Sequence, residues 1–165
     1  HKNDWMPCMR SPLIWRMPDC SEGMILVEAQ PLEVMDQYWQ TESTTPESGG
    51  ILLGYRREEH LHVIAATVPQ ATDCRRRFWF HRSARTHQEI ATQKWVLSDE
   101  TVDYLGEWHT HPESDPNPSA LDFSEWAKIS HLKLSTMIFL IMGWSGNIWI
   151  GKSVGKEILP CKQNI

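Results

Sequence analysis

Strand-forming and helix-forming segments alternate along this sequence between residues 24 and 154. Runs rich in Val, Ile, Leu and aromatic residues predict strands at 24–30, 50–56, 61–69, 76–82, 103–111, 136–144 and 147–154. Helical spacing of apolar residues predicts helices at 31–40, 83–98 and 118–132. Alternation of this kind, with no repeat and no linker, predicts one α/β or α+β domain.

The segment before the first strand differs from the rest of the chain. Residues 1–22 are rich in Pro and Met and show little periodicity. We expect them to form an N-terminal extended arm that lies on the domain. The domain itself is expected to cover residues 23–165.

Composition narrows the classes of partner. A net charge of −5 disfavours non-specific binding to nucleic acid. The sequence contains no signal peptide and no apolar run of about 18 residues, which a membrane-spanning helix would need. The four cysteines include no CxxC pair, so a structural zinc ribbon is not expected and the thiols are interpreted as reduced. We therefore expect a cytoplasmic protein without nucleic-acid or membrane partners.

The stretch GEWHTHPESDPNPSALDFSEW, residues 106–126, contains the residues best suited to chemistry. On a strand, His109 and His111 point to the same face, and two imidazoles at that spacing can bind one metal ion. On the following helix, Ser119 and Asp122 share a face. If that helix folds back over the strand end, Asp122 can supply a third ligand. Two His and one carboxylate suit zinc and leave its fourth position for water.

The same residues also allow a structural interpretation. Histidines one residue apart are common on surface strands. The spacing Ser119-x-x-Asp122 fits a capping box, in which Ser caps the helix and the acid reaches back to the backbone. The two roles can coexist, because a capped helix start also fixes where its acid points. Upstream, Glu47 can equally be an exposed loop acid.

Taken together, these elements resemble a known family. His109-Thr110-His111-Pro112 and Ser119-x-x-Asp122, with ten residues between His111 and Asp122, are similar to the JAMM metalloprotease motif of MPN (JAB) domains. Glu47 before Gly49-Gly50 is similar to the upstream part of that motif in bacterial members. The resemblance covers residues 24–155. It implies a three-layer, cytidine-deaminase-like fold with a mixed β-sheet and flanking helices.

The resemblance also implies roles for individual residues in a zinc metalloprotease. One Zn²⁺ per chain would be bound by His109, His111 and Asp122. Glu47 would take the proton of the attacking water, and Ser119 would stabilise the oxyanion. JAMM enzymes of this kind hydrolyse isopeptide or peptide bonds after the C-terminus of ubiquitin or a ubiquitin-like protein. Their substrate tail binds as an added β-strand.

A narrower resemblance concerns the substrate. RFWFHRSARTHQ and YLGEWHTHPE are similar to the JAMM deconjugating isopeptidases of bacterial anti-phage CBASS operons. This implies that the chain removes a cGAS/DncV-like nucleotidyltransferase from the targets to which it is conjugated. His87 and Gln88 would then line the substrate groove. Alternatively, they belong to the solvated polar face of a helix.

The sequence is also compatible with two other functions. The same chemistry could process the precursor of a ubiquitin-like or sulfur-carrier protein. The chain could also be a non-catalytic MPN scaffold, although the intact set of site residues argues against that. Trp108 and Trp126 flank the site residues and are interpreted as packing that fixes the metal ligands.

Overall fold

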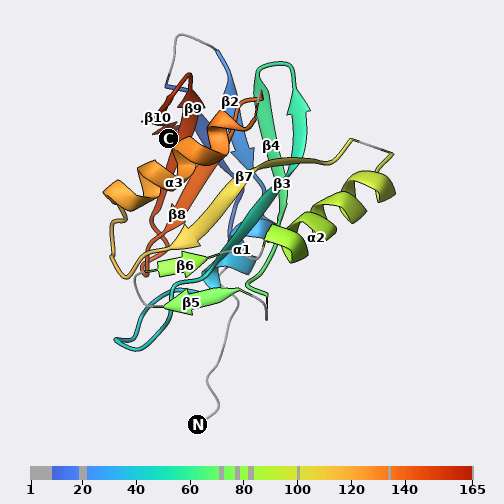
Figure 1. The fold of residues 1–165 in the computed structure, drawn as a ribbon. Coiled ribbons are helices and arrows are strands. Elements are labelled where there is room, and N and C mark those ends of the chain that lie inside the picture. Colours follow the sequence, from blue (N-terminus) through green and yellow to red (C-terminus); the bar gives the residue numbers. More distant parts are fainter. Residues whose placement is uncertain are drawn as a thin grey trace.

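A mixed β-sheet forms the centre of the computed structural model, which describes residues 9–18, 22–70, 73–76, 79–81, 84–99, 101–133 and 135–164. Within these residues the sheet has nine strands in the order β10-β9-β8-β7-β3-β4-β2-β1-β11 (Figure 1). Their bounds are Leu13–Arg16 (β1), Met24–Val27 (β2), Gly49–Arg57 (β3), His60–Ala66 (β4), Asp103–Thr110 (β7), Ile138–Met142 (β8), Ile148–Val154 (β9), Glu157–Pro160 (β10) and Lys162–Gln163 (β11). Neighbouring strands are antiparallel except β2 with β4 and β7 with β8.

Helices cover both faces of this sheet. They are α1 (Ala29–Asp36), α2 (Ala84–Leu97) and α3 (Ala120–His131). Strand β8 is buried on both sides, and its alternate residues belong to different cores. Leu140 packs in the same core as Leu32 of α1, whereas Phe139 packs with Trp126 of α3. Helix α2 lies on the α3 side over β3 and β7 (Figure 1). The predicted three-layer fold with a mixed sheet is therefore confirmed.

Two predicted elements differ from the structure. The helix predicted at 31–40 begins earlier, at Ala29, inside the strand predicted at 24–30, and it ends at Asp36. Tyr38 and Trp39, which the prediction placed on the helix, pack against the core from the segment that follows it. The strand predicted at 76–82 is instead divided into β5 (Cys74–Arg76) and β6 (Trp79–His81). Arg76 pairs with Trp79, so the chain reverses direction between the two strands and forms a separate two-stranded sheet.

Part of the N-terminal segment belongs to the central sheet. Strand β1 pairs with β2 on one side and with the C-terminal strand β11 on the other. Trp15 is 2% exposed and belongs to the largest core. The domain boundary expected at residue 22 stays a prediction.

The ends of three elements meet at one edge of the sheet. Strand β3 begins where β7 ends, and Gly49 pairs with His109 while Gly50 pairs with Trp108. A Cβ atom at Gly50 would lie 2.3 Å from the backbone oxygen of Thr67, so this position has no room for a side chain. Helix α3 starts shortly after β7 ends. Residues from β3, β7 and α3 can therefore act together at this edge.

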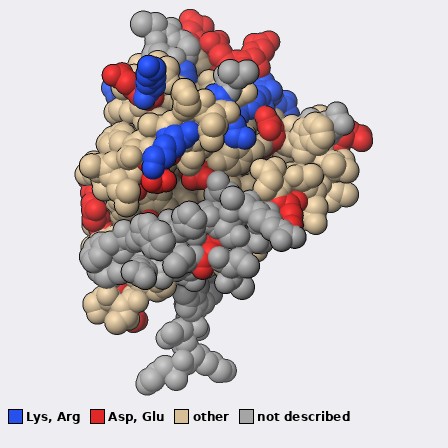
Figure 2. All heavy atoms as spheres, viewed as in Figure 1, with Lys and Arg blue, Asp and Glu red and all other residues tan. Residues whose placement is uncertain are grey.

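Surface charge is mixed on the face seen in Figure 2, where Lys and Arg lie among Asp and Glu. Ion pairs such as Arg56 with Asp103 and Lys128 with Glu125 join opposite charges. None of the helices in the described parts of the chain is long and apolar enough to cross a membrane.

Candidate metal centre

Two histidine side chains at the end of β7 point to the same place. Alternation along the strand puts His109 and His111 on the α3 side and turns Thr110 to the α1 side. The Nε2 atoms of the two histidines lie 3.1 Å apart. Each residue is only 8% exposed. The predicted juxtaposition of the two imidazoles is therefore present in the fold.

The start of α3 brings a carboxylate to the same two nitrogens. Asp122 Oδ1 lies 3.3 Å from His109 Nε2, and Asp122 Oδ2 lies 3.1 Å from His111 Nε2. The capping box is also present, because Ser119 Oγ accepts from the Asp122 amide and Asp122 Oδ2 accepts from the Ser119 amide. The capping hypothesis is confirmed. The cap holds the first turn of α3 so that its acid points at the histidines.

Glu47 approaches from the loop before β3. It is 5% exposed, and one of its carboxylate oxygens, with one nitrogen each from His109 and His111, forms a group within 4.8 Å that could hold a metal ion. Its neighbour Ser48 continues the pairing of β3 with β7, because Thr110 N donates to Ser48 O. The fold therefore brings together Glu47, His109, His111 and Asp122, which are 75 positions apart at their extremes (122 − 47).

The two carboxylates differ in their affinity for protons. Burial, followed by repulsion from Asp122, raises the pKa of Glu47 to about 9. Burial acts in the same direction on the pKa of Asp122. It is outweighed there by hydrogen bonds from His109 and His111, by the charge of His109 and by the Ser119 amide, which hold that pKa well below its usual range. Asp122 is thus the permanent anion of the site, and Glu47 is the group that can accept a proton.

An exposed acid lies beside one of the two histidines. Glu113 Oε1 is 3.5 Å from His111 Nδ1, and the Glu113 side chain is 49% exposed. Within the described residues, that buried nitrogen has no hydrogen-bond partner. If His111 Nε2 binds a metal, Nδ1 carries the proton, and Glu113 is the nearby anion that favours this tautomer.

Aromatic rings pack next to the two histidines. The Trp126 ring lies 5.8 Å from the His109 ring and stacks on Phe139 and Trp149. Trp108 is 1% exposed, and its Nε1 donates to Thr67 O. Trp126 therefore packs against a candidate ligand, as expected, whereas Trp108 lies on the other face of β7, in the core that contains Leu32.

The donor set suits a metal ion of the zinc type. Imidazole nitrogens and carboxylate oxygens are ordinary zinc ligands, and three protein ligands with one open position characterise catalytic zinc sites. His109, His111 and Asp122 face one another through ring nitrogens and carboxylate oxygens at 3.1 to 3.3 Å. Glu47 adds a second carboxylate at the same place. These residues could hold a metal ion.

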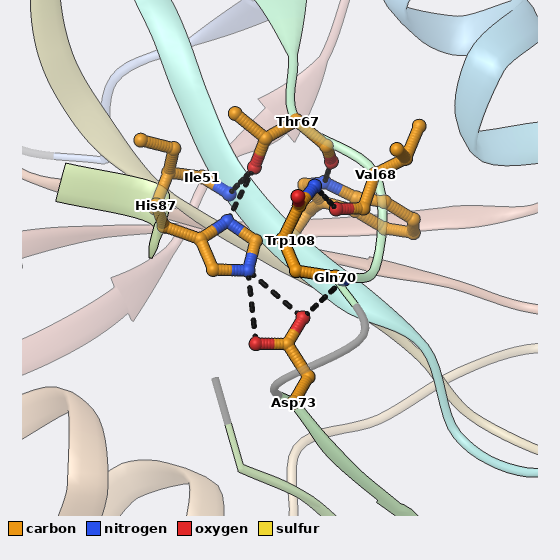
Figure 3. A network of polar contacts seen from close by, with 7 residues as sticks. All are labelled: Ile51, Thr67, Val68, Gln70, Asp73, His87 and Trp108. Carbon is orange, nitrogen blue, oxygen red and sulfur yellow. Dashed lines mark hydrogen bonds and ion pairs between the residues drawn. The ribbon is translucent and has the colours of Figure 1, made fainter. Parts of the chain in front are cut away.

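The predicted substrate-binding residues have different environments. His87 is fully buried, and its Nδ1 lies 2.7 Å from Thr67 Oγ1 while its Nε2 lies 2.9 Å from Asp73 Oδ2 (Figure 3). Both ring nitrogens are therefore used within the protein, and a substrate contact by His87 stays a prediction. Gln88 is exposed, and its amide donates to Thr92 Oγ1. A substrate contact by Gln88 stays a prediction.

Comparison with known proteins gives the family. Residues 33–152 match the model of the family described as prokaryotic homologs of the JAB domain. The chain belongs to this family. The matched range includes all four converging side chains, so the JAB domain contains the whole candidate metal centre.

Three relatives of this JAB-domain chain carry the same name. A protein named CD-NTase/cGAS isopeptidase from Pseudomonas aeruginosa is 46% identical over 68% of this chain and 71% of its own length. Proteins of that name from Escherichia coli and Vibrio cholerae are 34% and 36% identical. The matches cover 89% and 88% of this chain and 93% and 92% of those two relatives.

A solved structure supports the fold alone. The solution structure of a protein from Desulfitobacterium hafniense superposes with a TM-score of 0.58 at 17% identity. The superposition covers 81% of this chain and 87% of the other.

Proposed function

We propose that this JAB-domain chain is a zinc-dependent isopeptidase that hydrolyses the bond after the C-terminus of a conjugated protein. The observation that carries this proposal is the convergence of His109, His111, Asp122 and Glu47 at the edge where β3, β7 and α3 meet. The names of the relatives support the reaction class. In this proposal His109, His111 and Asp122 hold the metal, and Glu47 acts as general base.

When bound, zinc supplies Lewis acidity, which lowers the pKa of a water molecule and polarises the scissile carbonyl. Glu47 Oε then accepts a proton from the attacking water as the hydroxyl oxygen bonds to the carbonyl carbon. As the C–N bond breaks, Glu47 delivers this proton to the leaving nitrogen. One water is consumed, and the products are a carboxylate and a free amine. The pKa of Glu47 is raised by burial in the metal-free chain, and a bound cation beside it would favour the ionised carboxylate, which is the form that accepts the proton.

Ser119 is proposed to stabilise the oxyanion that forms on the carbonyl oxygen. In the capping box its oxygen accepts from the Asp122 amide. A hydroxyl that accepts a hydrogen bond still carries one proton to donate. Donors placed at such an oxyanion contribute on the order of 2.7–4 kcal/mol in other hydrolases.

For the substrate, we propose a cGAS/DncV-like nucleotidyltransferase (CD-NTase) that is conjugated through its C-terminus in CBASS anti-phage defence. Three relatives named CD-NTase/cGAS isopeptidase support this choice. Two of them align with at least 88% of this chain, so the alignment includes the candidate metal centre.

A cleavage assay tests the proposal. The substrate is a CD-NTase with a short peptide fused after its C-terminus, incubated with zinc-loaded chain. Expected results are cleavage at the junction, no cleavage with chelator, and restoration by added zinc. Glu47→Gln should keep bound zinc and lose at least about a hundredfold in kcat, as expected for loss of a general base. His109→Ala should lose the metal itself.

Two further substrates define the alternatives. Cleavage of a ubiquitin-like or sulfur-carrier precursor fusion in place of the CD-NTase fusion would change the substrate class and keep the chemistry. Metal-free purified chain that neither takes up zinc nor cleaves any of the fusions would instead favour a non-catalytic scaffold.

A further inference from the structure

The residue between the two histidines faces away from the metal centre. Thr110 is fully buried on the α1 side of β7. Its Oγ1 accepts from Ser48 N at 3.0 Å and donates to Gln40 Oε1 at 2.9 Å. With Thr110 N donating to Ser48 O, the residue next to Glu47 is bound at both of its backbone polar groups.

Gln40 connects this bond pair to Thr45, which lies earlier in the loop that precedes β3. It is 2% exposed, and its Nε2 donates to Thr45 O at 3.2 Å. Its two side-chain groups therefore reach the loop at two places: directly at Thr45 and, through Thr110, at Ser48. Helix α1 ends at Asp36, so Gln40 lies outside the helix and its side chain is turned to the loop.

Neighbouring side chains in an extended segment point to opposite faces, so holding Ser48 also affects the side chain of Glu47 on the metal side. Ser48 continues the pairing of β3, so its neighbour Glu47 points to the opposite side from the Ser48–Thr110 contact. Fixing Ser48 against Thr110 therefore fixes the direction of the Glu47 carboxylate toward His109 and His111. A misplacement of about 1 Å at a reacting group can cost about a hundredfold in rate.

We propose that Gln40 is a positioning residue that holds the 41–48 loop and thereby places Glu47 at the metal centre. It acts through Thr110 from the face of the sheet opposite the metal. The catalytic consequence of this placement rests on the general-base role proposed for Glu47. The restraint on the loop does not depend on that role.

Gln40→Met tests the proposal, because Met is similar in size and lacks both the amide donor and the amide acceptor. Thr110→Val removes the linking hydroxyl, and Thr110→Ser retains it. Ser153→Ala is the matched control: Ser153 Oγ also accepts from a backbone amide, that of Met137, but lies toward the other end of the sheet.

The first readout uses the metal-free chain and needs no activity. Hydrogen–deuterium exchange should accelerate by about tenfold or more in residues 41–48 of Gln40→Met and Thr110→Val. Exchange in β8 should stay unchanged. Thr110→Ser should restore protection, and Ser153→Ala should leave residues 41–48 unaffected.

The second readout is catalysis, which tests whether Gln40 affects the placement of Glu47 and leaves substrate and zinc binding intact. For the zinc-loaded chain, kcat should fall by on the order of a hundredfold in Gln40→Met, with KM and zinc affinity within a few-fold of the original. The effects of Gln40→Met and Thr110→Val should not add, because both break one linked contact.

Other outcomes overturn the proposal. Gln40 would be a packing residue only if residues 41–48 of Gln40→Met exchange at the normal rate. The same conclusion would follow if Gln40→Met, at equal stability, loses no more kcat than Ser153→Ala. If the original chain cleaves no substrate, the proposed function fails, and the exchange experiment alone decides whether Gln40 holds the loop.

Discussion

Burial disfavours the charged form of both Glu47 and Asp122, but only Glu47 ends with a raised pKa. Asp122 accepts hydrogen bonds from two histidines and a backbone amide, so it stays ionised. Glu47 is buried beside that negative charge, and its pKa is raised to about 9. Without a metal, the folded chain therefore binds a proton at Glu47 that the unfolded chain releases at a much lower pH.

This difference predicts a pH-dependent effect of Glu47→Gln on stability. A raised folded-state pKa contributes stability that is fully present below the unfolded value of 4.5 and is lost as pH rises toward about 9. Gln has the shape of the neutral acid and does not ionise. In metal-free chain, the advantage of Glu47→Gln in free energy of unfolding should therefore grow between pH 5 and pH 9.

Urea unfolding in the presence of a chelator measures this effect. Between pH 5 and pH 9 Asp122 stays ionised in both proteins, so its contribution cancels in the difference. A Glu47→Gln effect that is the same at pH 5 and pH 9 would contradict the raised pKa.

At the residue scale, prediction from the sequence succeeded where spacing was local. His109 and His111 share a face because of strand alternation, and Asp122 is fixed by its own helix cap. Gln40 was not predicted, because its contact with Thr110 joins residues 70 positions apart and neither residue type indicates it. The burial of His87 depends in the same way on Asp73 and Thr67, which come from another segment.

Helix α2 is joined to the sheet by the network in Figure 3. His87 of α2 contacts Thr67, whose Oγ1 also accepts from Ile51 N of β3. On the other side, Asp73 accepts from the Gln70 amide, so the segment before β5 is tied to the same histidine. The network therefore connects one helix, one strand and one loop through a single imidazole.

Removal of one partner from this network should destabilise the chain. Asp73→Ala leaves buried His87 Nε2 without its acceptor, and a buried unsatisfied group costs about 1–3 kcal/mol. The free energy of unfolding by urea should fall by that amount. Gln88→Ala, on the exposed side of the same helix, is the control and should change it little. Equal stability of both variants would show that the network does not hold α2.

At the element scale, short strands were the hardest to predict. β5 and β6 have three residues each, and one apolar run, RRFWFHR, contains a chain reversal between them. β11 has two residues and is a strand only because β1 lies beside it. The longer strands β3 and β4, which pair as a hairpin, were predicted as strands at 50–56 and 61–69, because each carries enough apolar residues to identify it.

At the scale of the whole molecule, the first and last strands of the sheet, β1 and β11, pair with each other. β1 lies between β2 and β11, so residues near both termini pair with each other at one side of the molecule. Trp15 is the largest apolar side chain that β1 contributes to the core. The stability of the domain should therefore depend on a segment that carries no site residue.

Trp15→Ala tests this dependence. Removing a large buried aromatic side chain should cost about 3–5 kcal/mol in free energy of unfolding. Ile14→Ala in the same strand, where the side chain is 36% exposed, should cost on the order of 1 kcal/mol. Zinc content of the folded fraction should be equal in both. A Trp15→Ala variant as stable as Ile14→Ala would show that β1 is only an attached arm.

The ring stack behind the metal centre has an optical consequence. Trp126 and Trp149 are nearly parallel, at 8° with 5.5 Å between centroids, and Trp126 also neighbours His109. The electronic transitions of two indole rings at that separation couple, so we expect the pair to contribute a coupled band to the circular dichroism spectrum. Ion uptake at His109 changes the electric field on one member of the pair. The chain thus carries an intrinsic spectroscopic probe beside its candidate metal centre.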